Sequence, residues 1–160
     1  DMACAHVELD TITCNAAVSA CEKGGEWTRA LGLLVEMAST SVESNTITYN
    51  AAVSSCEKGG EWAKALGLLV AMAAARVESD IITYNAAVSA CDKGGEWAQA
   101  LGLLVKMASA RVDADIYTFN SAVSACDTGG AWVEALALLV EMAFACVKTD
   151  TITYSAAVSA

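Results

Sequence analysis

The sequence predicts an all-α fold, a superhelical solenoid of stacked helix-turn-helix hairpins formed by a single repeat array over residues 1–160. The phrase CEKGGEW at 21–27 returns at 56–62, as CDKGGEW at 91–97 and as CDTGGAW at 126–132, which sets a repeat period of 35 residues. Each period also contains two apolar series with helical spacing. A single hairpin cannot bury so broad an apolar face, whereas stacked neighbours can.

The repeat frame accounts for every residue of the chain. The complete repeats, called repeats 1 to 4 from here on, are residues 11–45, 46–80, 81–115 and 116–150. Residues 1–10 match the last ten places of a repeat, and residues 151–160 match the first ten. We therefore expect a fragment of a longer array, with any targeting segment outside it.

The first helix of each repeat is predicted from one apolar face and two end signals. In repeat 1, Cys14, Ala17, Val18 and Cys21 follow the i, i+3, i+4, i+7 spacing of a helix face. The double glycine at 24–25 breaks this helix and permits a tight turn. The last place of each repeat is expected to supply the N-cap of the following helix, from Asn45, Asp80, Asp115 and Asp150.

The second helix of each repeat follows the double glycine. Its apolar series in repeat 1 consists of Trp27, Ala30, Leu31, Leu34, Met37 and Ala38. Leu33 and Val35 widen this face to more than half of the circumference, so we expect the second helix to be covered on both flanks. A polar connector, residues 39–45, then leads to the next repeat.

Composition narrows the classes of function. The net charge of −10 opposes binding through phosphates. No apolar run approaches the roughly 18 residues of a membrane span, so membrane insertion is not expected. The single histidine, His6, and the absence of a CxxC pair argue against a metal site. We predict no cofactor and no catalytic residues, and hence no enzyme activity.

The cysteines indicate core packing rather than disulfides. Four of the seven lie on the repeat period, namely Cys21, Cys56, Cys91 and Cys126. Equivalent points of stacked helices lie roughly 10 Å apart, beyond the limit of about 7 Å between the Cα atoms of a disulfide. We interpret the cysteines as small core residues of a protein in a reducing compartment.

A stripe of side chains opposite the apolar face of each first helix is the candidate site. In repeat 1 it occupies the second, fifth, ninth and thirteenth places, Ile12, Asn15, Ser19 and Lys23, within an arc of about 80°. We call these four places the polar stripe. It recurs as Ile47, Asn50, Ser54, Lys58; Ile82, Asn85, Ser89, Lys93; and Tyr117, Asn120, Ser124, Thr128.

Each step of the polar stripe offers an apolar plate, an amide that donates and accepts, and usually a cation. These are the groups that can stack on a base, hydrogen-bond to its edge and neutralise its phosphate in single-stranded RNA. The simpler reading is that the plate packs on a neighbouring hairpin, the amide caps or is solvated, and the lysine is surface charge near a helix end.

Particular phrases resemble a known family. The 35-residue period, ITYNAAVSAC at 82–91 and EWAKALGLLVAM at 61–72 resemble pentatricopeptide repeat proteins over the whole chain. Tetratricopeptide repeats usually keep a period of about 34 residues. The wording ACEKGGEW at 20–27 is similar to large sets of these proteins in photosynthetic protists. The connector departs from the family pattern, because Ser41, Arg76, Arg111 and Cys146 stand where glycine is common, and Ser44, Ser79, Ala114 and Thr149 replace proline.

The resemblance implies a right-handed superhelix that binds single-stranded RNA in a chloroplast or mitochondrion and acts in RNA processing, stability or translation. It implies one nucleotide per repeat, read by two side chains. The fifth-place column is Asn15, Asn50, Asn85, Asn120 and Ser155, and the last-place column is Asn45, Asp80, Asp115 and Asp150. In the family, Asn with Asp favours uracil and Asn with Asn accepts a pyrimidine, so the implied target is U-rich or pyrimidine-rich.

The same resemblance assigns the remaining places of the stripe. Plates that would stack between bases are Ile12, Ile47, Ile82, Tyr117 and Ile152. Cations that would contact phosphates are Lys23, Lys58 and Lys93.

The alternative is a protein scaffold, an accessory structural subunit of an organellar assembly such as a ribosome, respiratory complex or photosystem. The acidic charge, the exposed isoleucines and a large concave surface all suit this function. The paired asparagine and aspartate columns distinguish the two, because a code needs them and a scaffold does not.

Overall fold

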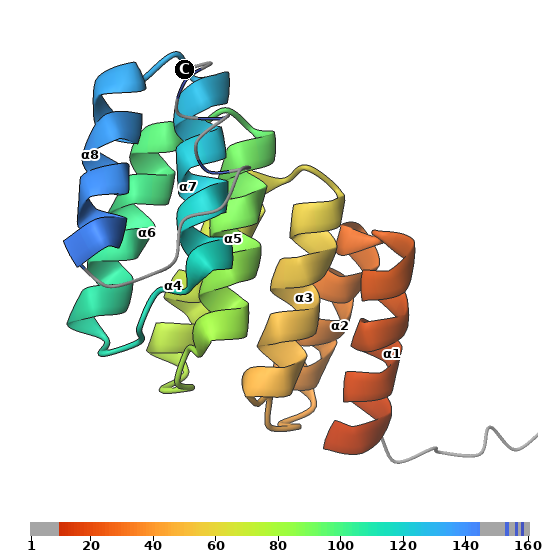
Figure 1. The fold of residues 1–160 in the computed structure, drawn as a ribbon. Helices are drawn as coiled ribbons and strands as arrows, with labels where there is room; N and C mark the ends of the chain where they lie inside the picture. The colour runs from red at the N-terminus through yellow and green to blue at the C-terminus, as the bar shows by residue number, and fades with distance from the viewer. Residues whose placement is uncertain (1–9, 145–152, 154–155, 157, 159–160) are drawn as a thin grey trace, which may run out of the picture.

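The computed structural model describes residues 10–144, 153, 156 and 158. This part of the chain contains eight helices and confirms the predicted all-α solenoid of stacked hairpins (Figure 1). The helices are α1 (Thr11–Gly24), α2 (Trp27–Ser39), α3 (Thr46–Lys58), α4 (Trp62–Ala74), α5 (Ile81–Lys93), α6 (Trp97–Ser109), α7 (Ile116–Thr128) and α8 (Trp132–Phe144). None of the described helices has the length and apolar character that crossing a membrane requires.

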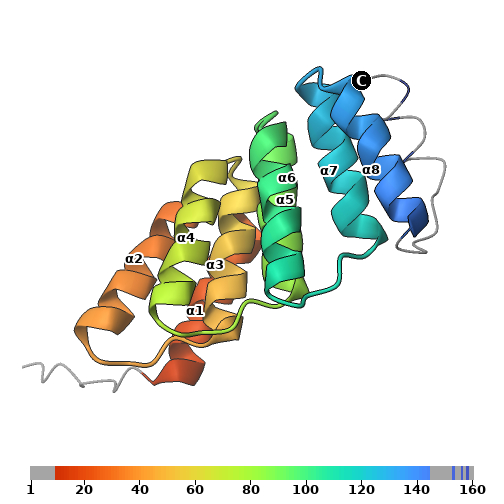
Figure 2. The ribbon, with the colours of Figure 1, turned by 90° about the vertical axis from the view of Figure 1, so that its left-hand side faces the viewer.

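The helices form two layers that differ in spacing. The first helices α1, α3, α5 and α7 pack directly on one another, side by side along the array (Figures 1 and 2). Among the described helices, no Cα atoms of successive second helices come within 8 Å of each other. Because the first-helix layer is the tighter one, the solenoid curves toward it, and the first helices line the inner surface.

The first helices begin where the N-caps predict. Asn45, Asp80 and Asp115 each accept a hydrogen bond from the backbone N–H three residues later, and the threonine at that position accepts one from the N-cap backbone N–H. This reciprocal pair is a capping box with threonine as its second member. Asp10 caps α1 with an N–H···O distance of 2.7 Å. Asp150 lies outside the described residues.

The double glycine joins neighbouring repeats as well as the two helices of a hairpin. A Cβ atom on Gly94 would lie 2.5 Å from Cδ1 of Trp62 in the preceding repeat, closer than any real contact. Gly59 and Gly129 meet the tryptophans of their preceding repeats in the same way. The second glycine has a positive φ, for example 66° at Gly95, which a residue with a side chain rarely adopts. The first glycine therefore admits the tryptophan, and the second makes the turn.

Three connector residues adopt the left-handed backbone conformation that glycine usually supplies, although none of them is glycine. Ser41, Arg76 and Arg111 have φ of 57°, 57° and 58°, in the left-handed region. They follow the second helices, where the next N–H bonds back to a methionine carbonyl, as from Val77 to Met72 at 3.0 Å. This is the hydrogen bond that closes a Schellman motif.

The core runs between the two layers and repeats with the sequence. Its fully buried members include Met72 and Met107 of the second helices, and Val53 and Val88 of the first helices. The expectation that the second helices are covered on both flanks is wrong for two columns, because the alanines Ala38, Ala73, Ala108 and Ala143 are exposed as well as a column of valines. Exposed valines occur at Val35, Val70, Val105 and Val140. Second helices stand too far apart to cover them.

The described cysteines are free thiols, as expected. Cys56, Cys91 and Cys126 are fully buried, and burial raises the pKa of each thiol to about 11. Cys21 is half-buried at the edge of the array. Packing rather than reactivity is therefore the role of the periodic cysteines.

Candidate nucleic-acid interface

The polar stripe lies on the inner surface, and its plates are exposed. Ile12, Ile47, Ile82 and Tyr117 have 78%, 63%, 58% and 52% of their surface accessible. Successive stripes meet, because first helices pack side by side. A hollow of about 250 Å³ is lined by Ser19, Glu22, Ile47, Asn50, Ala51, Ser54 and Ile82 of α1, α3 and α5. Two plates and the amide between them thus share one depression.

The fifth-place and last-place columns are in contact within each described pair. Asn50 Nδ2 donates to Oδ1 and Oδ2 of Asp80, each at 3.1 Å. Asn85 Nδ2 lies 3.4 Å from both oxygens of Asp115. In repeat 1, Asn15 Nδ2 donates to Asn45 Oδ1 at 3.4 Å. The N-cap role explains the contact, because the last-place residue starts the helix that packs beside the fifth-place residue.

A third column, missed by the sequence reasoning, completes this network. Thr48, Thr83, Thr118 and Thr153 are fully buried, and their hydroxyls donate to the asparagine oxygen of the preceding repeat. The distance from Thr118 Oγ1 to Asn85 Oδ1 is 2.6 Å. The sequence signal was present, because threonine fills the third place of every repeat, three residues after an N-cap.

The lysines of the stripe are paired across repeats. Lys93 Nζ lies 2.7 Å from Glu57 Oε1 and 3.2 Å from the Glu57 carbonyl oxygen. Lys58 Nζ lies 3.3 Å from Glu22 Oε1. Among the described residues, no ion pair involves Lys23. The charge available to a phosphate is therefore already balanced at Lys58 and Lys93.

The thirteenth place of the polar stripe differs in repeat 4. Thr128 stands where the other repeats have lysine, beside Asp92 of the preceding repeat. Burial raises the pKa of the Asp92 carboxyl, and hydrogen bonds from the Ser124 and Thr128 side chains partly oppose this rise. An acidic residue thus contacts the next repeat at each of these steps.

Some predicted positions lie beyond the described region. Asp150, Ile152 and Ser155 are outside the described residues. Asn120 is half-buried and accepts a hydrogen bond from Thr153. The described residues contain no cluster of three or more histidine, cysteine or acidic side chains able to hold a metal ion.

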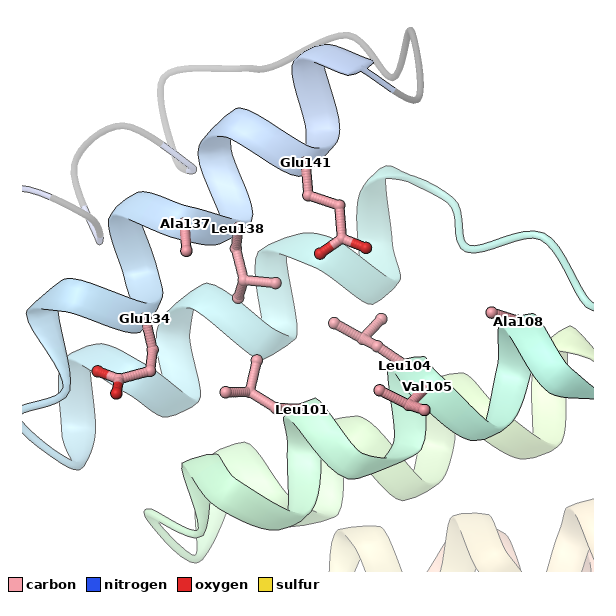
Figure 3. Close-up of a pocket in the computed structure, with 8 residues that line it drawn as sticks. All are labelled: Leu101, Leu104, Val105, Ala108, Glu134, Ala137, Leu138 and Glu141. Carbon is pink, nitrogen blue, oxygen red and sulfur yellow. The ribbon is translucent and has the colours of Figure 1, made fainter.

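The outer surface carries a separate apolar hollow between α6 and α8 (Figure 3). Its volume is about 370 Å³, and Leu138 of α8 points toward Leu101 and Leu104 of α6. Glu134 and Glu141 stand on the α8 side of the hollow. None of these residues belongs to the polar stripe.

A family model described as the pentatricopeptide repeat domain matches residues 1–58 and 68–128, and a second model, the PPR repeat, matches 47–77. The chain belongs to the pentatricopeptide repeat family. The threonine, asparagine and aspartate network therefore lies on the first helices of pentatricopeptide repeats. No curated protein matched this chain.

Solved pentatricopeptide structures share this fold. The maize protein PPR10 is 21% identical over 93% of this chain with a TM-score of 0.81. PPR10 in complex with an 18-nt psaJ RNA element is 25% identical over 97% of this chain, with a TM-score of 0.80. This chain spans 21% and 23% of those PPR10 chains. The pentatricopeptide domain of Arabidopsis thaliana protein-only RNase P 1, in complex with tRNA, is 13% identical over 94% of this chain and 79% of that one, with a TM-score of 0.80.

Proposed function

We propose that this chain binds single-stranded RNA along its inner surface, with one nucleotide per repeat and a preference for U-rich or pyrimidine-rich sequence. The observation that carries the proposal is the contact between the fifth-place amide and the last-place N-cap, repeated beside exposed plates. Asn50 with Asp80, next to Ile47 and Ile82, is the best-defined example. Support also comes from PPR10 and RNase P 1, whose solved pentatricopeptide structures contain RNA.

The asparagine amides and the exposed plates of the polar stripe can hydrogen-bond to a base and stack on it. An asparagine amide offers one donor and one acceptor side, which matches the Watson–Crick edge of a pyrimidine. Exposed plates on both sides give the base an apolar surface to stack on, and the aromatic ring of Tyr117 is the strongest of them. When RNA binds, Lys58 and Lys93 have to leave their glutamate partners to contact a phosphate.

Binding by this array is expected to be weak. Stacking contributes about 1–3 kcal/mol per base, or roughly 4–12 kcal/mol for four bases. Association costs about 4–15 kcal/mol before any surplus remains. The net charge of −10 further slows the encounter with RNA. Affinity should therefore rise steeply with the number of repeats and fall with salt.

The test is fluorescence anisotropy with labelled U-rich and A-rich oligonucleotides of about 12 nucleotides, long enough to cover the array. We expect tighter binding of the U-rich oligonucleotide at low salt, and loss of this preference in Asn50→Ala/Asn85→Ala. Gln99→Ala removes an amide from α6 on the outer surface and should change nothing. Absence of binding at low salt by an array shown to be helical by circular dichroism would overturn the proposal.

We further infer that the chain acts in RNA processing, stability or translation in a chloroplast or mitochondrion, as a binding protein without catalysis. The inference rests on the pentatricopeptide family, and the free thiols suit a reducing compartment.

A scaffold function remains the second candidate, because the outer surface offers an apolar hollow and a column of exposed valines. Protein subunits of an organellar complex would then be the partners. Substitution of Val105 would weaken such an assembly, whereas Asn50→Ala/Asn85→Ala would not, and pull-down of each variant from organelle extract separates the two functions.

A further inference from the structure

Each described fifth-place asparagine is held by the start of a following helix, and Asn50 shows this most fully. The hydroxyl of the buried Thr83 donates to Asn50 Oδ1, while Asn50 Nδ2 donates to both oxygens of Asp80. Asp80 and Thr83 are the two side chains of the capping box that begins α5. Asn85 on α5 is held in the same way by Thr118 and Asp115, the capping box that begins α7.

The capping box determines whether the Asn50 amide turns its oxygen or its nitrogen toward Thr83 and Asp80. The Asp80 backbone N–H donates to Thr83 Oγ1 at 3.2 Å, so the threonine hydroxyl proton has to point elsewhere. The Thr83 hydroxyl oxygen lies 2.9 Å from Asp80 Oδ1, which also accepts the Thr83 backbone N–H at 2.9 Å, so the hydroxyl can donate to Asp80 as well as to Asn50. The carboxylate of Asp80 can only accept. Asn50 therefore turns its oxygen to Thr83 and its nitrogen to Asp80.

A fixed amide can distinguish uracil from cytosine. Uracil presents an N3–H donor beside its O4 acceptor, whereas cytosine presents an N3 acceptor beside its amino donor. A 180° rotation of an asparagine amide exchanges its donor and its acceptor. An amide free to rotate therefore fits either pyrimidine, and an amide held at both ends fits one of them better.

We propose that the third-place threonine of each repeat positions the base-reading asparagine of the repeat before it, and so sets the preference for uracil over cytosine. This rests on the proposed function, since it requires RNA on the inner surface. The reading unit for one nucleotide then spans two repeats. Asn50 of repeat 2 needs Thr83 of repeat 3, and Asn120 of repeat 4 needs Thr153.

Repeat 1 shows a weaker form of the same device. Asn45 Oδ1 accepts the Thr48 backbone N–H at 3.1 Å, so the N-cap role makes even an amide present its oxygen to Asn15. Thr48 again donates to Asn15 Oδ1. A neutral oxygen holds the amide less firmly than a carboxylate does. In repeat 1, Thr48 therefore contributes more to fixing the asparagine amide than Thr83 and Thr118 do beside an aspartate.

The experiment compares U-rich and C-rich oligonucleotides that differ only at their central positions. Thr83→Val/Thr118→Val keeps the buried shape but removes the hydroxyls beside Asn50 and Asn85. Thr83→Ser/Thr118→Ser restores them. Thr13→Val is the control, because Thr13 occupies the same place in α1 and, among the described residues, makes no hydrogen bond to an asparagine.

We expect the ratio of U to C affinity to fall about two- to tenfold for each hydroxyl removed, the range of one neutral hydrogen bond, and hence further in the double valine variant than in either single variant. The serine variant and Thr13→Val should keep the ratio of the unmodified chain. Circular dichroism checks the fold, and the single variants Thr83→Val and Thr118→Val carry the comparison if the double variant unfolds.

Two results overturn the inference while leaving RNA binding intact. One is an unchanged ratio in a folded valine variant, and the other is an equal fall in the serine variant, which would indicate packing rather than the hydroxyl. Failure of the unmodified chain to bind either oligonucleotide would instead overturn the proposed function, and this inference with it.

Discussion

Adding one methyl group at Gly94 tests whether the recurring glycine and tryptophan join neighbouring repeats. The backbone there has φ −87° and ψ −6°, which alanine adopts without strain. The new Cβ atom would lie 2.5 Å from Trp62 Cδ1 and 3.2 Å from its Cγ and Nε1. Gly94→Ala therefore forces the Trp62 ring or the α5 turn to move, and overpacking of this kind costs about 1–3 kcal/mol.

Two other glycines calibrate this cost. Gly102 lies inside α6, and a methyl group added there would have no neighbouring atom within 4 Å, so Gly102→Ala should stabilise the array by about 0.5–1 kcal/mol. Gly60 has the same open space but a φ of 72°, so Gly60→Ala should cost about 1–2 kcal/mol through backbone strain alone.

The assay is urea unfolding followed by circular dichroism, with each substitution also made in a Trp62→Ala background. If the methyl group acts through the ring, the cost of Gly94→Ala should disappear in that background, as a coupling between residues in contact. The reasoning is refuted if Gly94→Ala stabilises the array as Gly102→Ala does. It is refuted equally by an unchanged cost when the ring is absent.

Three further predictions concern charge, backbone strain and pH. Glu57→Gln frees Lys93 from an ion pair worth about 0.2–1 kcal/mol, so RNA should bind up to about fivefold tighter, with a salt slope steeper by about 0.7. Glu36→Gln on α2 should have less effect, and anisotropy across a salt series checks both variants. Arg76→Gly should raise the free energy of unfolding by about 1 kcal/mol, and with it the urea midpoint, because glycine adopts the left-handed conformation of Arg76 without strain, whereas Arg76→Ala should not. The buried cysteines of repeats 2 to 4 have a pKa near 11 against 9.0 when exposed, so the unfolded chain binds fewer protons between these values and stability should fall from about pH 9 to about 11. Replacing these cysteines with alanine should flatten that fall in urea midpoints.

The features that could be predicted from the sequence are those that a single repeat determines. Helical spacing placed the two helices, and the last-place residues Asn45, Asp80 and Asp115 were found as N-caps. A helical wheel placed Ile47 and Ile82 on an exposed face. All of these depend on neighbours within about one helical turn, where spacing fixes geometry.

The features that were missed join one repeat to the next. Lys58 follows Glu57 in sequence, yet its ion-pair partner is Glu22, 36 residues earlier. A helical wheel gives the direction of a side chain but not the neighbour that it meets. The exposed valines were missed for the same reason, because the spacing of second helices depends on how the hairpins stack.

The central claim is that the fifth-place and last-place columns contact RNA, and the side-chain amides report on it directly. The chain has five asparagines, all in these columns, and one glutamine, Gln99, on the outer surface. Six pairs of side-chain NH₂ signals in a ¹H–¹⁵N spectrum therefore separate the candidate site from a built-in control.

The first measurement is a titration of the ¹⁵N-labelled chain with U-rich RNA at low salt. The account predicts that the signals of Asn50 and Asn85 shift with the RNA concentration while the Gln99 pair stays in place. Binding detected by anisotropy with unmoved asparagine signals would place the RNA elsewhere on the molecule and contradict the account.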